Sequence, residues 1–273
     1  MKTKLTANED QLMDQLRQRG RRTIDVRLDR LWLNKITDHP SFLLHQLHRK
    51  GLAHPLQRGR HEVHLDRVPS STPRVESFEV LASAVLARLE MNYYLSWHSA
   101  LWHHHLIDQQ SAKAYVAVDG RKRPARVGRL EVMFITLRPH HFFGWTTTRS
   151  GGWPVNVAGV EKAIVDSLFR PQFALGLPQI AMALQRAWAE RRINPDLLAA
   201  TAIRFGNKLL CRRLGYLMEG LAIPGWEALL AELGWSGPTV LELGFPPPER
   251  AVVSTRWGVF ENPHLLALAR SPK

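Results

Sequence analysis

A segment rich in proline, serine and charge divides this chain into two unequal parts. Residues 66–77 read DRVPSSTPRVES, and such a composition sustains neither a helix nor a strand. We interpret this segment as a linker. The sequence therefore predicts a small domain at residues 1–65 and a larger one at residues 78–273.

The N-terminal part begins with two helix signals. Asn8, which acidic residues follow, is predicted to cap a first helix that ends at Gly20. A second helix is predicted to start after Thr23 or Asp25. Its apolar residues are Val26, Leu28, Leu31, Trp32 and Leu33. Because they cover a wide part of the helix surface, we expect this helix to be the most buried element of the domain.

A third helix and a hairpin complete this part. Asp38 is predicted to cap the helix, Pro40 suits its first turn, and Gly51 suits the left-handed residue after its end. Two short alternating segments, 52–56 and 61–65, follow it and are joined by a basic turn. Three helices and a hairpin with a basic tip predict a winged helix-turn-helix, an architecture that binds DNA.

The third helix has one apolar face and one polar face. At about 100° per residue, Pro40 and three leucines share the first face. The opposite side, predicted to enter the major groove, carries Ser41, Phe42, His45 and Arg49. Three further basic residues suit phosphate contacts, which position a protein without reading sequence. They are Lys50, Arg58 and Arg60.

The charge of the chain supports a polyanionic partner. The formal net charge is +13, and the sequence pI is about 10.5. Residues 1–65 carry 13 basic and 7 acidic side chains, which is nearly half of the surplus. Lys and Arg in such excess release counterions when they meet nucleic-acid phosphates.

Enzyme and membrane signatures are missing from the sequence. It contains no phosphate-binding glycine loop, no GxSxG and no Cys-x-x-Cys, and it holds a single cysteine, Cys211. The longest apolar run, residues 80–87, is too short to span a bilayer, and the start of the chain lacks the apolar core of a signal peptide. We therefore expect no catalytic residues, metal or cofactor, no membrane partner, and a reducing cytoplasm as the location.

The larger part is predicted to be mixed α/β and mainly helical in its last third, so the whole chain is expected to be α+β and rich in helix. A helix is predicted over the residues after 78, through Phe78, Leu81, Val85 and Leu89, and Ser96 is predicted to cap the next one. Strands are predicted at 114–118 and 130–137, and helices from Gly159 onward, including one long run over 196–221.

Two basic segments stand out in this part. The turn between the predicted strands is expected to form a basic hairpin, which is either a solvated turn or a second contact with phosphate or a partner. It holds Arg121, Lys122, Arg123, Arg126 and Arg129. The long helical run is predicted to align a positive stripe, which is either a solvated face or a docking surface. The stripe comprises Arg204, Lys208 and Arg212, with Arg213 beside them.

A metal site is the weaker interpretation of the histidine-rich segment. His98 and His105 share a helix stripe, whereas His103 points elsewhere, and no HExxH or suitably spaced carboxylate accompanies them. Glu161 and Asp166 would point to opposite sides of a helix, so an i,i+4 ion pair explains the acids better. That pair joins Lys162 to Asp166.

Five segments of the chain resemble, in order and spacing, the AbiEi family of antitoxin-type transcriptional regulators. They are YYLSWHSALWHHHL, GRKRPARVG, VNVAGVEKAIVDSLFRP, RFGNKLLCRRLGYLME and STRWGVFEN. The resemblance departs at His105, where the family usually has a glycine before the leucine, and in the second helix, where Arg27, Arg30 and Trp32 are not a close match.

The resemblance implies a bacterial antitoxin that represses its own operon and counteracts a nucleotidyltransferase toxin. The N-terminal domain would bind inverted repeats in its own promoter, as a dimer or cooperatively, through Phe42, His45, Arg49, Arg58 and Arg60. The basic residues of 204–213 would belong to the antitoxic domain.

Two other functions remain open besides the one that the resemblance implies. One is a protein-binding module that sequesters a toxin or another partner directly, with DNA binding secondary. The other is a metal-dependent hydrolase that uses His98, His103 and His105.

Overall fold

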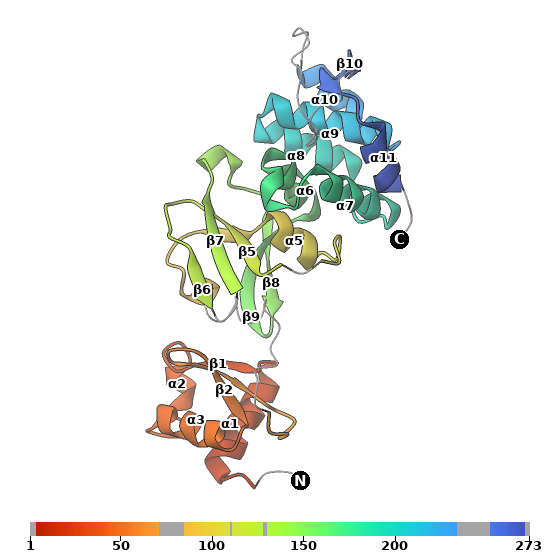
Figure 1. The fold of residues 1–273 in the computed structure, drawn as a ribbon. Coiled ribbons are helices and arrows are strands. Elements are labelled where there is room, and N and C mark those ends of the chain that lie inside the picture. The colour runs from red at the N-terminus through yellow and green to blue at the C-terminus, as the bar shows by residue number, and fades with distance from the viewer. Residues whose placement is uncertain (1–3, 71–84, 110, 128–129, 234–251, 271–273) are drawn as a thin grey trace.

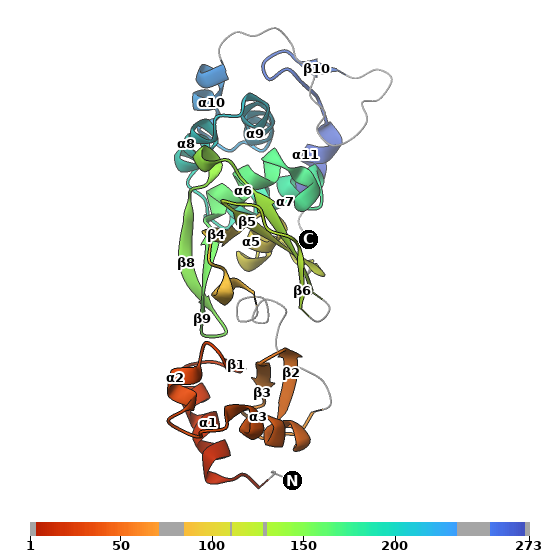
Figure 2. The same ribbon diagram turned by 90° about the vertical axis from the view of Figure 1, so that its left-hand side faces the viewer.

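The chain folds into a mixed α/β structure with two parts stacked end to end (Figure 1). The computed structural model describes residues 4–70, 85–109, 111–127, 130–233 and 252–270. The first part, the head, comprises residues 4–70 and has its own apolar core. The second part, the body, has a six-stranded sheet next to the head and a helical layer beyond that sheet (Figures 1 and 2). Of the predicted linker, residues 71–77 lie outside the described residues, as do Phe78 and Leu81.

The head combines three helices with a small antiparallel sheet. Its helices are α1 (Ala7–Gln18), α2 (Arg30–Leu33) and α3 (Pro40–Arg49). The strands β1 (Thr23–Asp25), β2 (Ala53–Gln57) and β3 (Arg60–Val63) pair in the order β1-β3-β2. The predicted hairpin at 52–65 is thus confirmed, because β2 and β3 pair as antiparallel neighbours around the turn at Arg58 and Gly59.

Two predictions in the head are wrong. The cap of α1 is Thr6 and not Asn8: the Thr6 side chain accepts a hydrogen bond from the Glu9 backbone, and the Glu9 carboxylate accepts one from the Thr6 backbone at 2.7 Å. The N-cap of α3 is likewise His39 and not Asp38, although Pro40 does occupy the first turn.

The predicted second helix is mostly absent. The chain forms strand β1 at Thr23–Asp25, and only the four residues of α2 are helical. Leu31 is 88% exposed, and Leu28 is exposed as well, so α2 is not the most buried element. The strand forms because β1 pairs with β3, with Thr23 opposite Glu62 and Asp25 opposite Arg60. Local sequence patterns do not reveal such distant pairing.

The sheet of the body has six strands in the order β6-β7-β5-β4-β9-β8. Three of them run consecutively along the chain, namely β5 (Lys113–Val118), β6 (Ala125–Val127) and β7 (Leu130–Thr136). The others are β4 (Tyr93–Leu95), β8 (Trp145–Ser150) and β9 (Trp153–Ala158). Pairs β5–β7 and β4–β9 are parallel, and the other neighbours are antiparallel.

The sheet corrects two expectations. Of the helix predicted after residue 78, the described residues Val85 to Leu89 form only a 3-10 turn, η1 (Leu86–Arg88), and strand β4 follows it. The strands at 114–118 and 130–137 do not form a hairpin, because β5 and β7 are parallel. The basic segment between them is a crossover that ends in edge strand β6, and β6 forms the hairpin with β7.

Helices dominate the last third, as predicted, but the long run at 196–221 is two helices. Helix α5 (Trp97–His103) precedes β5, while α6 (Val160–Phe169) and α7 (Leu177–Ala189) follow the sheet. Gly206, in the left-handed conformation at φ +72°, separates α8 (Pro195–Phe205) from α9 (Lys208–Gly220). The described chain ends with α10 (Trp226–Leu233), the short strands β10 (Val253–Ser254) and β11 (Val259–Phe260), and α11 (Pro263–Arg270).

Helix α5 ends in a Schellman motif with a histidine where glycine is the usual residue. His105 donates its backbone N–H to Trp102, Leu106 donates to Leu101 at 2.9 Å, and His105 has φ +53°. This left-handed conformation is strained for any residue with a Cβ. The side chain of His105 is exposed, so the strain is not offset by burial of the ring.

We expect His105→Gly to raise the free energy of unfolding by about 1 kcal/mol, because glycine adopts this conformation without the Cβ penalty. Urea unfolding would measure the change. His105→Ala keeps the Cβ and serves as the control, for which no gain is expected. Equal stability of all three proteins would show that residue 105 is unstrained.

His141 makes the stability of the body depend on pH. Its ring stacks on Phe205 with the centroids 3.9 Å apart, and the residue is 8% exposed. Burial, with added repulsion from the charges of His140 and Lys162, lowers the pKa of His141 to about 4. In the unfolded chain His141 therefore becomes protonated near pH 6.5, whereas in the folded chain it becomes protonated only near pH 4.

We expect stability to fall as the pH is lowered from 6.5 toward 4, by about 3 kcal/mol for His141 at the end of this range. His141→Gln, which stays neutral, should lose less stability than the wild type. Urea unfolding of both proteins at pH 7.0, 5.5 and 4.5 would test this, because carboxylates that titrate in this range are common to both and cancel in the comparison. Parallel pH profiles for the two proteins would contradict the prediction.

Candidate nucleic-acid interface

The exposed face of α3 carries the residues that the sequence predicts to read DNA. Leu43, Leu44 and Leu47 are buried in the core of the head. The helical period therefore turns the other side to solvent. Ser41, Phe42, His45 and Arg49 are all exposed there, Phe42 by 62%. Within the described chain, neither His45 nor Arg49 forms an ion pair.

The three predicted phosphate contacts have different surroundings. Arg58 is exposed at the tip of the β2–β3 hairpin. Arg60 is 1% exposed, and its Nε donates to the Asp25 carboxylate at 2.5 Å. The interpretation of Arg60 as a surface phosphate contact is therefore wrong. Its register opposite Asp25 on β1 turns it inward.

Lys50 is partly occupied within the head. Its Nζ lies 2.6 Å from Oε2 of the buried Glu9, the residue that completes the cap of α1. Burial raises the pKa of Glu9, but hydrogen bonds from Lys50 and Thr6 outweigh burial and hold that pKa below its usual range. Lys50 thus joins α3 to α1, and this pairing reduces its availability to a phosphate.

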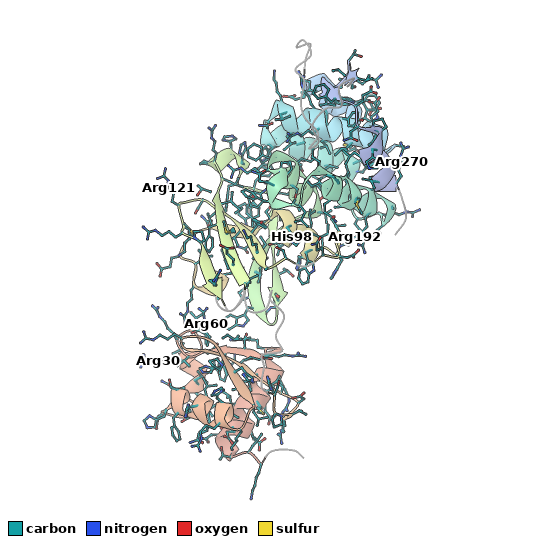
Figure 3. All side chains as sticks on the ribbon, viewed as in Figure 1. Arg30, Arg60, His98, Arg121, Arg192 and Arg270 are labelled. Carbon is teal, nitrogen blue, oxygen red and sulfur yellow. The ribbon has the colours of Figure 1, made fainter. Side chains whose placement is uncertain are left out.

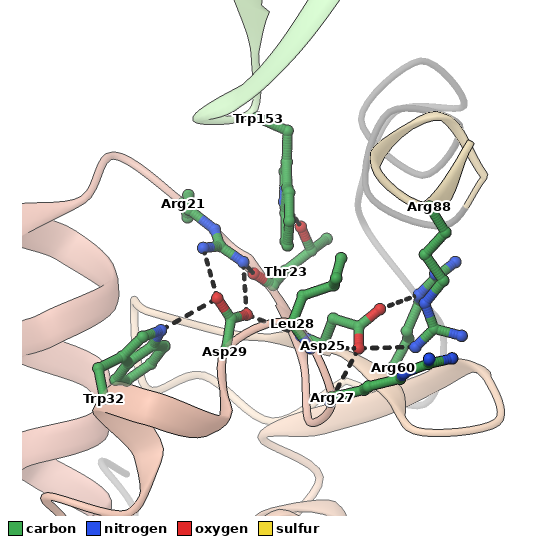
Figure 4. A network of polar contacts seen from close by, with 10 residues as sticks. All are labelled: Arg21, Thr23, Asp25, Arg27, Leu28, Asp29, Trp32, Arg60, Arg88 and Trp153. Carbon is green, nitrogen blue, oxygen red and sulfur yellow. Dashed lines mark hydrogen bonds and ion pairs between the residues drawn. The ribbon is translucent and has the colours of Figure 1, made fainter. Parts of the chain in front are cut away.

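The head is attached to the tip of the β8–β9 hairpin of the body. Trp153 Nε1 donates to Thr23 Oγ1 at 2.7 Å, and the Arg21 guanidinium lies 3.5 Å from the centre of the Trp153 ring (Figure 4). A bidentate pair with the buried Asp29 holds Arg21 in place. A Cβ at Gly152 would lie 2.2 Å from Arg21 Cγ, so only glycine permits this close approach.

A second contact between head and body centres on Asp25. This carboxylate is fully buried and accepts hydrogen bonds from Arg60 of the head and, at 2.7 Å, from Arg88 of the body (Figure 4). It also accepts the backbone N–H of Arg27 at 2.9 Å. Burial raises the pKa of Asp25, but the hydrogen bonds from Arg88 and Arg60 more than offset it and keep this pKa low. Asp25 is therefore an anion that organises several arginines.

The basic segment of the body lies at the edge of the large sheet. Arg121, Lys122, Arg123 and Arg126 are all exposed, and Arg126 is on edge strand β6. Figure 3 shows Arg121 on the same side of the molecule as Arg30 of the head. Arg129 lies outside the described residues. These four side chains remain candidates for a second phosphate contact.

The predicted positive stripe at 204–213 is wrong. Arg204 ends α8 and Lys208 begins α9, so Gly206 puts them on different helices. Arg212 is 7% exposed. Arg213 is half-buried and donates to the Leu168 backbone at 3.0 Å. Arg204 and Lys208 are exposed, but they do not form one surface with the other two.

Comparison with known proteins identifies the fold alone. No protein-family model matches the sequence, and no curated protein matches it. Among solved structures, the RV2827C protein from Mycobacterium tuberculosis is similar, with a TM-score of 0.64. The match covers 97% of this chain and 94% of that one at 13% sequence identity. Head and body thus occur together in another protein of known structure.

The predicted Lys162–Asp166 ion pair is confirmed, but its surroundings were not foreseen. Both side chains are buried on α6, where Asp166 also accepts hydrogen bonds from Ser96 at 2.6 Å and Tyr94 at 3.1 Å. The Lys162 ammonium faces the rings of Tyr94, Phe143 and Phe205 at 4.9–5.3 Å. Ser96 thus turns its side chain to Asp166 and does not cap α5 through it. No sequence signal joined Tyr94 to a pair about 70 positions away.

The histidines give no support to a metal site in the part of the chain that the structure describes. No group of three or more His, Cys, Asp or Glu side chains is placed to hold an ion there. His98 is buried, and burial lowers its pKa. His104 donates a hydrogen bond from Nε2 to the Ala158 backbone oxygen at 2.7 Å. Among the same residues, no helix has the length and apolar character that a membrane span requires.

Proposed function

We propose that this protein is a DNA-binding antitoxin that represses its own operon and counteracts a nucleotidyltransferase toxin. The observation that carries the proposal is the exposed face of α3, where Ser41, Phe42, His45 and Arg49 face solvent beside a hairpin with a basic tip. In this proposal the head is a winged helix-turn-helix, α3 is its recognition helix and the β2–β3 hairpin is its wing.

Charge supports a nucleic-acid partner. The chain carries a formal +13, and the head adds exposed arginines around the same hairpin. They include Arg22, Arg27, Arg30 and Arg58. Lys and Arg at such positions contact phosphates and contribute the affinity that depends on salt.

Four of the five segments that resemble the AbiEi family contact one another in the folded body, in two pairs, which supports the resemblance. Tyr94 and Ser96 of the first segment bond to Asp166 of the third. Gly215 of the fourth accommodates Trp257 of the fifth so closely that a Cβ would lie 2.0 Å from its ring. Trp257 Nε1 also donates to Glu219 at 2.6 Å.

The family's usual glycine fits the structure at His105. The residue adopts φ +53°, a conformation that favours glycine. The one departure in the first segment is thus at a position where the fold itself favours the family's residue.

Binding of the full-length protein to DNA upstream of its own gene tests the proposal. We expect preferential binding over a scrambled duplex of equal length, with affinity that falls steeply with salt. The second half of the proposal predicts a nucleotidyltransferase gene in the same operon, and co-expression with that gene tests it by rescue of growth. Equal and weak binding to both duplexes, together with a stable complex with the toxin, would favour the alternative of a protein-binding module.

A further inference from the structure

Several arginines gather around the buried Asp25 at the turn end of the β2–β3 hairpin. Asp25 is a single carboxylate, and Arg60 and Arg88 both donate to it. Arg27 is a third arginine at this place. Figure 4 shows its side chain on the same side of Asp25 as the side chains of Arg60 and Arg88. Two guanidinium groups therefore share one carboxylate, and Arg27 contacts the same carboxylate through its backbone N–H.

The hairpin tip adds a fourth arginine. The Val26 backbone N–H donates to the Gly59 carbonyl at 2.9 Å, which ties the end of β1 to the turn that holds Arg58. Arg27 and Arg58 are consequently neighbours on either side of this bond, and both are exposed. Neither side chain has an acidic partner within the described residues.

Buried residues hold this arginine cluster in place, so it is not a chance run of surface charge. Asp25 is fully buried, and Arg60 is 1% exposed. These two residues hold the turn end of the hairpin against β1 from inside. Arg88, whose side chain is 32% exposed, comes from η1 of the body. Guanidinium groups held in this way have a fixed fork geometry that matches phosphate oxygens.

We infer that Arg27, Arg58 and Arg88 form a phosphate clamp for the DNA backbone, organised by the buried Asp25–Arg60 pair. This inference rests on the proposed function, and it adds a residue of the body, Arg88, to the DNA contact. DNA that engages the hairpin then touches head and body together. The clamp contributes affinity and not sequence preference, because phosphates are alike in every sequence.

The salt dependence of DNA binding tests the clamp in the full-length protein. Fluorescence anisotropy would measure binding to the upstream duplex and to a scrambled duplex. The salt would range from about 50 to about 300 mM NaCl, because phosphate contacts weaken over this range. For Arg27→Ala, we expect the slope of log K against log salt to flatten by about 0.9 on both duplexes. The ratio of the two affinities should stay unchanged.

Three further variants make the result specific. Arg27→Lys keeps the charge and should restore most of the slope. Arg88→Gln retains a hydrogen-bond donor for Asp25 but loses the charge, and we expect a similar flattening. Arg186→Ala removes one charge from α7, where Arg186 pairs with Asp108 and Glu190. It should leave the slope unchanged.

The clamp and the proposed function fail in different ways. If the wild type binds the upstream duplex while Arg27→Ala and Arg88→Gln keep its slope, the clamp is refuted and the function stands. If the wild type binds neither duplex, both are refuted. If only sequence preference changes, the arginines read bases and are not a clamp.

Discussion

Replacing His45 and Arg49 together by alanine is expected to abolish the preference for DNA upstream of the gene. Both side chains are exposed on the face of α3 opposite the buried leucines. A good contact with a base edge contributes about 1–3 kcal/mol of discrimination. Loss of two such contacts should reduce the preference by roughly 30-fold or more.

Binding to the upstream and scrambled duplexes at one salt concentration measures this effect. We expect the fold to be unaffected, because exposed substitutions usually change stability by less than about 0.5 kcal/mol. Arg138→Ala combined with His140→Ala is the matched control, since both residues are exposed on the body. The α3 interpretation is wrong if the double variant of the head keeps the wild-type preference.

The second large effect is expected in the body, at Asp166. Asp166→Ala leaves the Lys162 ammonium buried without its carboxylate, and Tyr94 and Ser96 lose their acceptor. Removal of one partner of a buried pair typically costs about 3–5 kcal/mol. We expect the free energy of unfolding to fall by an amount in this range.

Two comparisons identify the cause. Adding Lys162→Met to Asp166→Ala removes the uncompensated charge, so the double variant should be more stable than the single one. Asp10→Ala breaks the half-exposed pair with Arg67 and should cost about 0–1 kcal/mol. Urea unfolding measures all three variants. A loss at Asp166 no larger than that at Asp10 would show that the buried pair contributes little.

Local patterns were sufficient for α3 and its exposed face. The leucines at 43, 44 and 47 recur with the helical period, Pro40 suits the first turn, and Gly51 takes the left-handed conformation after the helix. Each of these signals acts within one or two turns of chain. The face that carries His45 and Arg49 was therefore predictable, and so was the hairpin that follows.

Burial of charge was not predictable, because the partners are distant in sequence. Arg60 and Arg58 are equally basic beside the same turn, yet only Arg60 is buried, since Asp25 lies across the sheet from it 35 positions earlier. The burial of Arg212 was unpredictable for the same reason, because it depends on how α9 packs in the body.

Four features were determined by the sequence itself, because each depends on residues within a short segment of chain. They are the proposed division of the chain, the helices with regular apolar spacing, the β2–β3 hairpin and the Lys162–Asp166 pair. Only the tertiary structure decided the parallel pairing of β5 with β7, the strand at Tyr93–Leu95 and the contacts of Arg88 and Trp153 with the head. These join segments 18 to 130 positions apart. Which of many possible distant partners meet is determined by the packing of the whole chain and not by any local pattern.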